Sequence, residues 1–155
     1  MNPHCTILLV DDDENDAFIV RRALEKIGFD GMFRRVPDAE SARAYLEGKA
    51  PFEDRDYNPM PQLVLSDSHL GSVSGVQLLQ WTRREPQFGE VPFVLFSGSI
   101  SSEDATAAVE NGATAYFVKP AAFEETVVQM HEIVSHMPER CRPWLKPPPN
   151  DATQS

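Results

Sequence analysis

Short apolar runs alternate with stretches of helical character five times along this chain, and that alternation constrains the fold more than any other feature. The runs expected as strands lie at residues 5–10, 31–36, 63–66, 92–96 and 114–118. The expected helices cover residues 15–27, 38–47, 74–84, 101–111 and 121–136. A nearly wholly apolar run such as CTILLV is typical of a strand buried on both faces. The pattern therefore predicts an α/β fold with a parallel sheet and right-handed crossovers.

The charge of the chain narrows the classes of partner. Its 155 residues include 24 acidic and 14 basic side chains, giving a formal net charge of -10. Such a balance repels phosphate backbones and anionic lipids, which argues against direct binding to nucleic acid or to a membrane. A protein partner or a small charged ligand is expected instead.

The sequence shows no targeting signal and no membrane span. Residues 6–10 form too short an apolar run for a signal peptide, and no segment approaches the roughly 20 apolar residues that a membrane helix needs. The two cysteines, Cys5 and Cys141, stand at opposite ends of the chain, which does not suggest a disulfide framework. We therefore expect a cytoplasmic protein with reduced thiols.

Length and composition predict one domain followed by a tail. A chain of this length can bury a core of its own. We expect the domain to cover residues 1–137. Residues 138–155 are rich in proline and polar side chains, so a mostly flexible tail is expected there.

Chemically active side chains follow four of the five expected strands. Three aspartates, Asp11 to Asp13, come after the first strand, Asp67 after the third, Ser97 after the fourth and Lys119 after the fifth. In an open parallel sheet the carboxyl ends of the strands share one edge, where ligands bind. These side chains are therefore expected to meet in one site.

The residue types at this edge fit phosphoryl chemistry with a magnesium ion. Asp11, Asp12 and Asp67 offer the hard oxygen ligands that Mg2+ binds while it keeps waters for a phosphate. The metal and Lys119 would offset the repulsion among the carboxylates. If Asp67 attacks phosphorus, the same two cations can hold the product and the Ser97 hydroxyl can donate to it.

Each of these residues taken alone has a simpler explanation. Aspartates at a helix start often only cap the helix and balance its dipole. Asp67 alone is equally typical of a turn, and Ser97 and Lys119 are ordinary at the end of a strand. Their joint placement at four strand ends favours a functional site.

At this point the chain resembles the receiver domain of two-component response regulators, over about residues 5–137. The motifs that carry the resemblance are ILLVDD at residues 7–12, LVLSD at 63–67, FSG at 96–98 and YFVKP at 116–120. The resemblance implies a flavodoxin-like (βα)5 doubly wound sheet with strand order 2-1-3-4-5. The long loop at residues 50–61 is similar to that of stand-alone regulators associated with bacterial phytochromes.

The resemblance also implies roles around the metal. Asp67 would be the phosphoacceptor. Asp12 would bind Mg2+ directly with Asp11 beside it, and Asp67 and the backbone carbonyl of His69 would complete the protein ligands. The phosphoryl group would come from a sensor histidine kinase or a phosphotransfer protein.

A second set of implied roles concerns the response to phosphorylation. Lys119, Ser97 and Gly98 would hold the phosphoryl group, and Ser97 and Tyr116 would switch conformation together. The changed surface would pass the signal to a downstream protein or to a second copy of the chain. The chain would thus promote only its own phosphorylation and dephosphorylation, without being an enzyme in the usual sense.

Departures from the family pattern and two rival functions remain open. His69, Gly71 and Gly98 stand where the family often has asparagine, proline and alanine, and the glycines predict looser loops. A haloacid-dehalogenase-like phosphatase would use Asp11 as nucleophile within a D-x-D motif ending at Asp13. A binding module that keeps only the fold would use none of these residues chemically.

Overall fold

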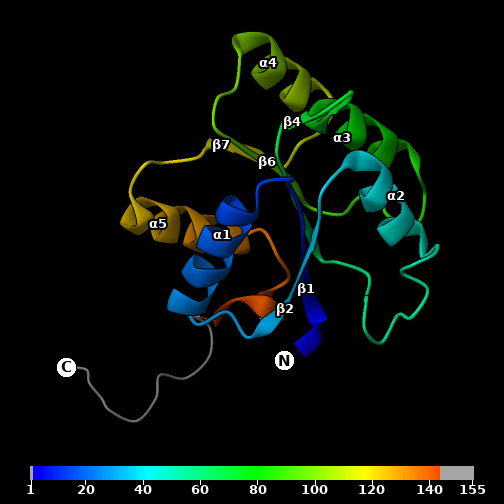
Figure 1. The fold of residues 1–155 in the computed structure, drawn as a ribbon, viewed down its shortest axis with the longest axis horizontal. Coiled ribbons are helices and arrows are strands. Elements are labelled where there is room, and N and C mark those ends of the chain that lie inside the picture. Colours follow the sequence, from blue (N-terminus) through cyan, green and yellow to red (C-terminus); the bar gives the residue numbers. More distant parts are fainter. Residues whose placement is uncertain (1, 144–155) are drawn as a thin grey trace.

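The computed structural model describes residues 2–143, and their strands form one main sheet. All five strands of this sheet run parallel, in the order β2-β1-β3-β6-β7 (Figure 1). They are β1 (Asn2–Val10), β2 (Gly31–Val36), β3 (Leu63–Ser66), β6 (Phe93–Ser97) and β7 (Ala115–Val118). Numbered within this sheet alone, the order is 2-1-3-4-5. The predicted fold and strand order are confirmed.

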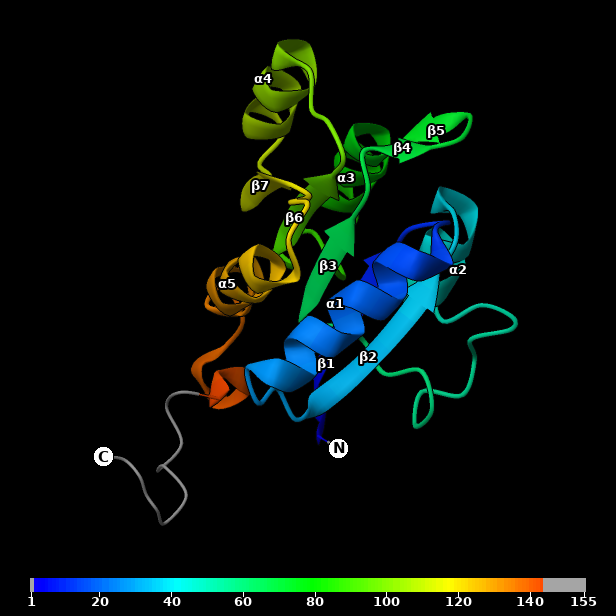
Figure 2. The same ribbon diagram turned by 60° about the vertical axis from the view of Figure 1, so that its left-hand side comes forward.

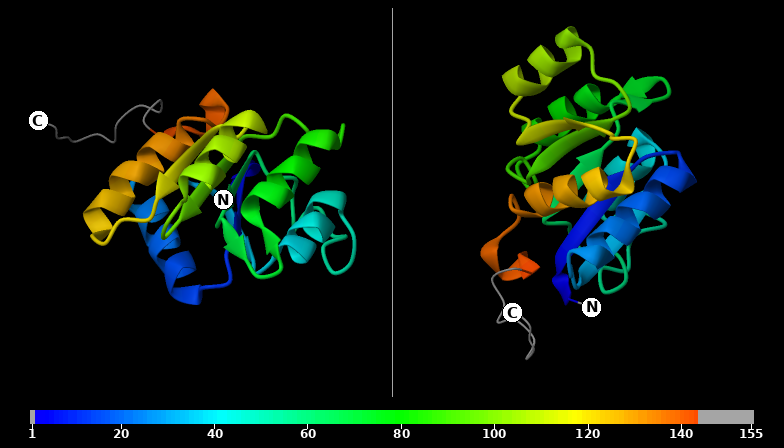
Figure 3. Two further views of the ribbon diagram at one scale, coloured as in Figure 1. Left: turned by 90° about the horizontal axis from the view of Figure 1, so that it is seen from above. Right: turned by 90° about the vertical axis from the view of Figure 1, so that its left-hand side faces the viewer.

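Helices cover both faces of the sheet, as Figures 2 and 3 show. α1 (Glu14–Lys26) and α5 (Phe123–Val134) lie side by side on one face. α2 (Ala39–Glu47), α3 (Gly75–Arg84) and α4 (Ser102–Glu110) lie on the other. The five predicted helices are all present.

Alternate residues of β1 serve two separate cores. Ile7 and Leu9 pack with side chains of α1 and α5, whereas Leu8 and Val10 pack with side chains of α2 and α3. All four are at most 1% exposed. Because both faces of β1 need apolar side chains, its sequence is a continuous apolar run.

Polar caps begin the helices at the predicted places. The Asp38 carboxylate accepts the N–H of Ser41 at 2.7 Å, at the start of α2. Ser74 and Gln77 form the reciprocal capping box at the start of α3. These bonds satisfy helix N–H groups that have no partner within the helix.

A short hairpin that the sequence did not predict follows Asp67. β4 (His69–Leu70) pairs antiparallel with β5 (Val73–Ser74). Gly71 begins the connecting turn with φ of 83°, a conformation that two-residue hairpin turns require and that glycine adopts at little cost. Gly71 therefore makes a tight turn where a loose loop was expected.

A disulfide contradicts the prediction of reduced thiols. Cys5 and Cys141 are bonded, with their Cα atoms 5.4 Å apart. Cys141 ends the short 3-10 helix η1 (Glu139–Cys141), where the Arg140 guanidinium donates to the carbonyl of His4 at 3.0 Å. Because α5 returns the chain to the amino end of the sheet, two cysteines 136 residues apart in the sequence become neighbours.

The expected tail begins with ordered chain. Residues 138–143 contain η1 and pack against β1. Residues 144–155 lie outside the described residues, so a flexible tail over 138–155 and the domain limit at residue 137 remain predictions. Within residues 2–143, each helix is too short or too polar to cross a membrane.

Candidate functional site

The site lies at the carboxyl edge of the sheet. β1 ends just before Asp11 and β3 just before Asp67, and the neighbouring strands align Val10 with Ser66. β7 ends just before Lys119, whose N–H donates to the carbonyl of Ser97 at 2.7 Å. Parallel pairing therefore brings together residues that are far apart in the sequence.

The Lys119 ammonium is at the centre of the site. Its Nζ lies 2.8 Å from Asp11 Oδ2, 2.7 Å from Asp16 Oδ2 and 3.1 Å from Asp67 Oδ2. The Lys119 side chain is 14% exposed and that of Asp11 1%. An ammonium has three donors, so these three carboxylates can satisfy all of them.

Burial and pairing act against each other on the charges of the site. Burial raises the pKa of the Asp11 carboxyl above its ordinary value, although hydrogen bonds from Lys119 and the Asp13 N–H work to lower it. Burial also lowers the pKa of the Lys119 ammonium, but its bonds to Asp11 and Asp16 outweigh that effect and hold this pKa above its ordinary value. Lys119 therefore remains charged at neutral pH.

Contacts with backbone groups hold both the main chain and the carboxylate of Asp67. The N–H of Asp67 donates to the carbonyl of Val10 at 2.9 Å, and Asp67 Oδ1 accepts the N–H of His69 at 3.1 Å. Gly75, at the start of α3, is so close to the carbonyl of Asp67 that a Cβ atom there would collide with it. The acceptor loop is therefore held from both β1 and α3.

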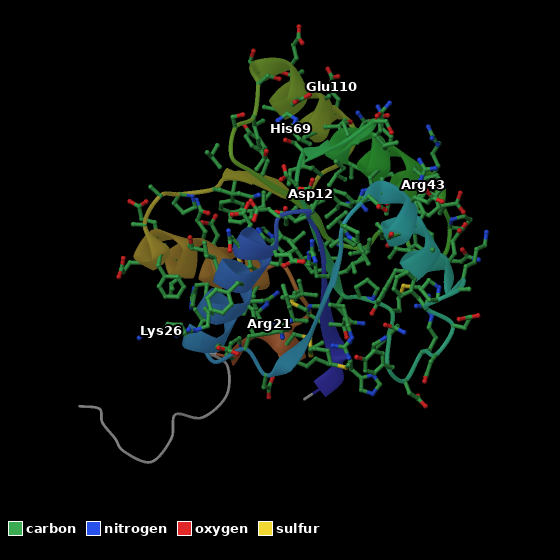
Figure 4. All side chains as sticks on the ribbon, in the orientation of Figure 1. Asp12, Arg21, Lys26, Arg43, His69 and Glu110 are labelled. Carbon is green, nitrogen blue, oxygen red and sulfur yellow. A yellow bond between two sulfur atoms is a disulfide. The ribbon has the colours of Figure 1, made fainter. Side chains whose placement is uncertain are left out.

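Asp12 and His69 lie on the open side of this edge, and Figure 4 shows both side chains near the top of the sheet. Among residues 2–143, no three Asp, Glu, His or Cys side chains are gathered closely enough to hold a metal. Asp11 and Asp67 each share one oxygen with Lys119 instead. The expected oxygen donors are present at this edge, but they are not arranged around a common point as metal ligands would be.

The predicted switch residues are on the neighbouring strands β6 and β7 but differ in burial. Ser97 is fully buried, and its hydroxyl shares a 2.7 Å hydrogen bond with the hydroxyl of Ser68. Tyr116 on β7 is 44% exposed. A Cβ atom at Gly98 would meet no atom within 4 Å.

Sequence reasoning missed Asp16 and Ser68. Asp16 is within the first turn of α1, and it reaches Lys119 from a helix and not from the end of a strand. Ser68 directly follows Asp67, and a hydroxyl buried to 1% exposure gives no sign of its partner in the sequence. Asp13 caps α1 by accepting the N–H groups of Asn15 and Asp16, so the capping explanation holds for this one aspartate.

A model of a known protein family matches most of the chain. Residues 7–131 match the model described as response regulator receiver domain. The probable methanogenesis regulatory protein FilR2 of Methanothrix harundinacea (strain 6Ac) is 31% identical over 127 residues, which cover 82% of this chain and 79% of that protein. The chain spans about half the length (51%) of the next curated relatives, which are transcriptional regulators.

Solved structures share the fold over most of their length. A response regulator in red light signalling of R. palustris superimposes with a TM-score of 0.77 at 26% identity, covering 83% of this chain and 90% of that one. The Mn(2+)-bound form of response regulator Rcp1 superimposes with a TM-score of 0.75 at 25% identity, covering 84% and 92%.

Proposed function

This chain belongs to the response regulator receiver domain family of two-component signalling, and we propose that Asp67 is its phosphoacceptor. The observation that carries the proposal is the pair of contacts on the Asp67 carboxylate. The Lys119 ammonium lies on Oδ2 and the His69 N–H on Oδ1. A preorganised ammonium beside the reacting carboxylate can stabilise the negative charge of the phosphoryl group that forms there.

The proposed reaction is an in-line transfer. A carboxylate oxygen of Asp67 attacks the phosphorus of a phosphohistidine on a sensor histidine kinase or a phosphotransfer protein. The P–O bond to Asp67 forms as the P–N bond breaks, and the released imidazole takes up a proton. Lys119 then pairs with the phosphoryl oxygens, with Ser97 and Gly98 next to them.

Asp11, Asp12, Asp67 and the carbonyl of His69 would hold Mg2+. These are the oxygen donors that this ion prefers, and it commonly binds through one or two carboxylates. When bound, it would supply positive charge that offsets the phosphoryl group. Asp12 is exposed and accessible to the ion, whereas Lys119 would have to share the oxygens of Asp11 and Asp67.

Ser97 and Tyr116 would carry the response. Ser97 would exchange its bond to Ser68 for one to the phosphoryl group, and Tyr116 would turn from solvent into the space vacated. A change of this kind selects a state that already exists in the unmodified protein.

The output would pass through the face formed by α4, β7 and α5. Val109, Tyr116, Val118 and Val128 are between 44% and 68% exposed on these elements. Exposed apolar side chains gathered on one face are typical of a protein contact. A downstream protein or a second copy of the chain would bind there.

Phosphorylation with a labelled donor tests the acceptor. The wild-type protein, incubated with Mg2+ and labelled acetyl phosphate, should take up label that hydroxylamine removes, as expected of an acyl phosphate. Asp67→Asn should take up none, whereas Asp56→Asn, the same change at an exposed loop position, should be labelled like the wild type. Label on Asp67→Asn would assign the acceptor elsewhere.

Phosphate release from small esters, measured beside the labelling experiment, separates the rival functions. A phosphatase of the haloacid-dehalogenase type would release phosphate steadily from small esters and lose this activity in Asp11→Asn. The capping bonds of Asp13 and the burial of Asp11 argue against that role. A receiver-like binding module would remain unlabelled in every variant.

A further inference from the structure

We infer that Asp16 is the positioning residue for Lys119, the one acceptor that keeps this ammonium at the sheet edge while its other two acceptors change. The inference rests on the proposed function. It begins from the shortest of the three contacts of Lys119 Nζ, which is the 2.7 Å contact to Asp16 Oδ2.

Asp67 and Asp11 both change partners in the proposed reaction. One oxygen of Asp67 becomes part of the acyl phosphate, so this residue loses its own charge. Asp11 would share its oxygens with a metal ion. Asp16 is neither an acceptor of phosphorus nor one of the expected metal ligands, so neither event changes the partner of its carboxylate.

Asp16 is well placed to be a fixed point because it belongs to a helix and not to a loop. Its own N–H is held by the carboxylate of Asp13 at the start of α1. The next residue, Ala17, is buried in the core between α1 and the sheet and bonds through its N–H to the carbonyl of Asp13. The packing of α1 therefore sets the position of the Asp16 carboxylate.

The three distances also show that the ammonium lies closer to two of its acceptors than to the third. Nζ lies 2.7 Å from Asp16 and 2.8 Å from Asp11, but 3.1 Å from Asp67. Asp16 and Asp11 thus hold the cation slightly back from the reacting carboxylate. Without Asp16 the ammonium would be shared between Asp11 and Asp67 alone and would lose the anchor that aligns it with the incoming phosphoryl group.

An exposed ion pair usually contributes little free energy. The effect of removing Asp16 on the phosphorylation rate therefore depends on how deeply the Asp16–Lys119 pair is buried. The Asp16 side chain is 30% exposed and that of Lys119 14%. Loss of a charge-assisted hydrogen bond at this partly buried position should lower the rate of phosphorylation by about three- to tenfold.

The test compares Asp16→Asn with Glu14→Gln. Glu14 is in the same first turn of α1, is exposed and carries the same charge, so it controls for net charge and helix dipole. With Mg2+ and acetyl phosphate, Asp16→Asn should be phosphorylated about three- to tenfold more slowly, and Glu14→Gln at the wild-type rate. Asp16→Glu, which keeps the charge, should recover part of the loss.

A second readout needs no phosphorylation. In a proton–nitrogen NMR spectrum of lysine ammonium groups at low temperature, the Lys119 signal should be visible in the wild type and in Glu14→Gln, and it should be absent in Lys119→Arg. It should broaden in Asp16→Asn through faster exchange with water. Equal behaviour of Asp16→Asn and Glu14→Gln in both measurements overturns the role of Asp16. Failure of the wild type to accept phosphate overturns instead the proposed function on which that role rests.

Discussion

The two ends of β1 are built on different principles. Just past its carboxyl end, the carboxylates of Asp11 and Asp67 are joined through the Lys119 ammonium, which donates a hydrogen bond to each. Toward its amino end, about 20 Å away along the strand, Cys5 is bonded covalently to Cys141, and Arg140 adds a hydrogen bond to His4. One strand therefore has non-covalent contacts at its carboxyl end and a disulfide, which persists under oxidising conditions, near its amino end.

The difference shows how a small sheet can combine a fixed frame with a changeable edge. Buried apolar side chains hold the middle of β1 on both faces. Beyond them, the side chains of Asp11, Asp67 and Lys119 are held to one another by hydrogen bonds and charge. The opposite end contributes stability and should take no part in the chemistry.

Removing the disulfide should have the largest effect on stability and none on the site. The Cys5→Ala/Cys141→Ala double variant should lose about 3 to 5 kcal/mol of unfolding free energy, because a bond across 136 residues restricts the unfolded chain strongly. Urea unfolding of both proteins, with and without reductant, measures the loss. The variant should not respond to reductant, and its rate of phosphorylation by acetyl phosphate should equal that of the wild type.

A changed rate of phosphorylation would contradict this separation of the two ends of β1. It would mean that the disulfide near the amino end helps to position the residues at the carboxyl edge. Equal unfolding free energies of the wild type with and without reductant would show that the disulfide does not form in solution.

The contrast between the two ends also explains what the sequence could predict. A strand that ends in an acid is a local pattern, so Asp67 and Asp11 were identified from their own neighbourhoods, and parallel pairing then implied that they meet. The Cys5–Cys141 bond depends on how α5 returns the chain to β1, which no local pattern of residues records. The prediction from spacing alone was accordingly wrong for these cysteines.

Removing the central cation of the site should have the next largest effect. Lys119→Met leaves the buried carboxylates of Asp11 and Asp67 without their cation, which should cost about 3 kcal/mol of unfolding free energy at neutral pH. Lys26→Met, the same change at an exposed position far along α1 (Figure 4), should cost little. Urea unfolding at constant ionic strength compares the two.

The loss in Lys119→Met should also depend on pH. Burial already raises the pKa of Asp11 in the folded protein above 3.8, its ordinary value, and loss of Lys119 should raise it further. Between the unfolded and folded pKa values the folded state binds more protons, so the unfolding free energy falls as pH rises. The deficit of Lys119→Met should therefore shrink on acidification from about pH 7 to about pH 5. A deficit that grows on acidification would mean that another group dominates.

Asp16 and Ser68 show the limit of reasoning from strand ends. Asp16 reaches the site from α1 and not from a strand, so its role depends on the direction in which that helix presents its first turn. Ser68 meets Ser97 only because β3 and β6 are neighbours in the sheet. Both contacts follow from the tertiary arrangement, which the sequence predicts as a topology but not in its side-chain detail.

The smallest expected effect concerns the hydrogen bond between Ser68 and Ser97. Ser68→Ala should lower the unfolding free energy by about 1 kcal/mol, because the buried hydroxyl of Ser97 loses its partner. Ser72→Ala, at an exposed position of the nearby hairpin turn, should have almost no effect. A double-mutant cycle with Ser97→Ala should give a coupling of about 1 kcal/mol between the two hydroxyls.

The same bond should restrain the switch. If Ser97 must leave Ser68 to reach the phosphoryl group, the phosphorylated state gives up the free energy of this hydrogen bond. In Ser68→Ala that loss is absent, so the variant should bind beryllofluoride, a mimic of the phosphoryl group, with Mg2+ about fivefold more tightly. Tyr116 fluorescence or NMR shifts can follow that binding. Weaker binding would mean that Ser68 supports Ser97 in both states, in which case the carboxyl edge is less exchangeable than its contacts in the unmodified protein indicate.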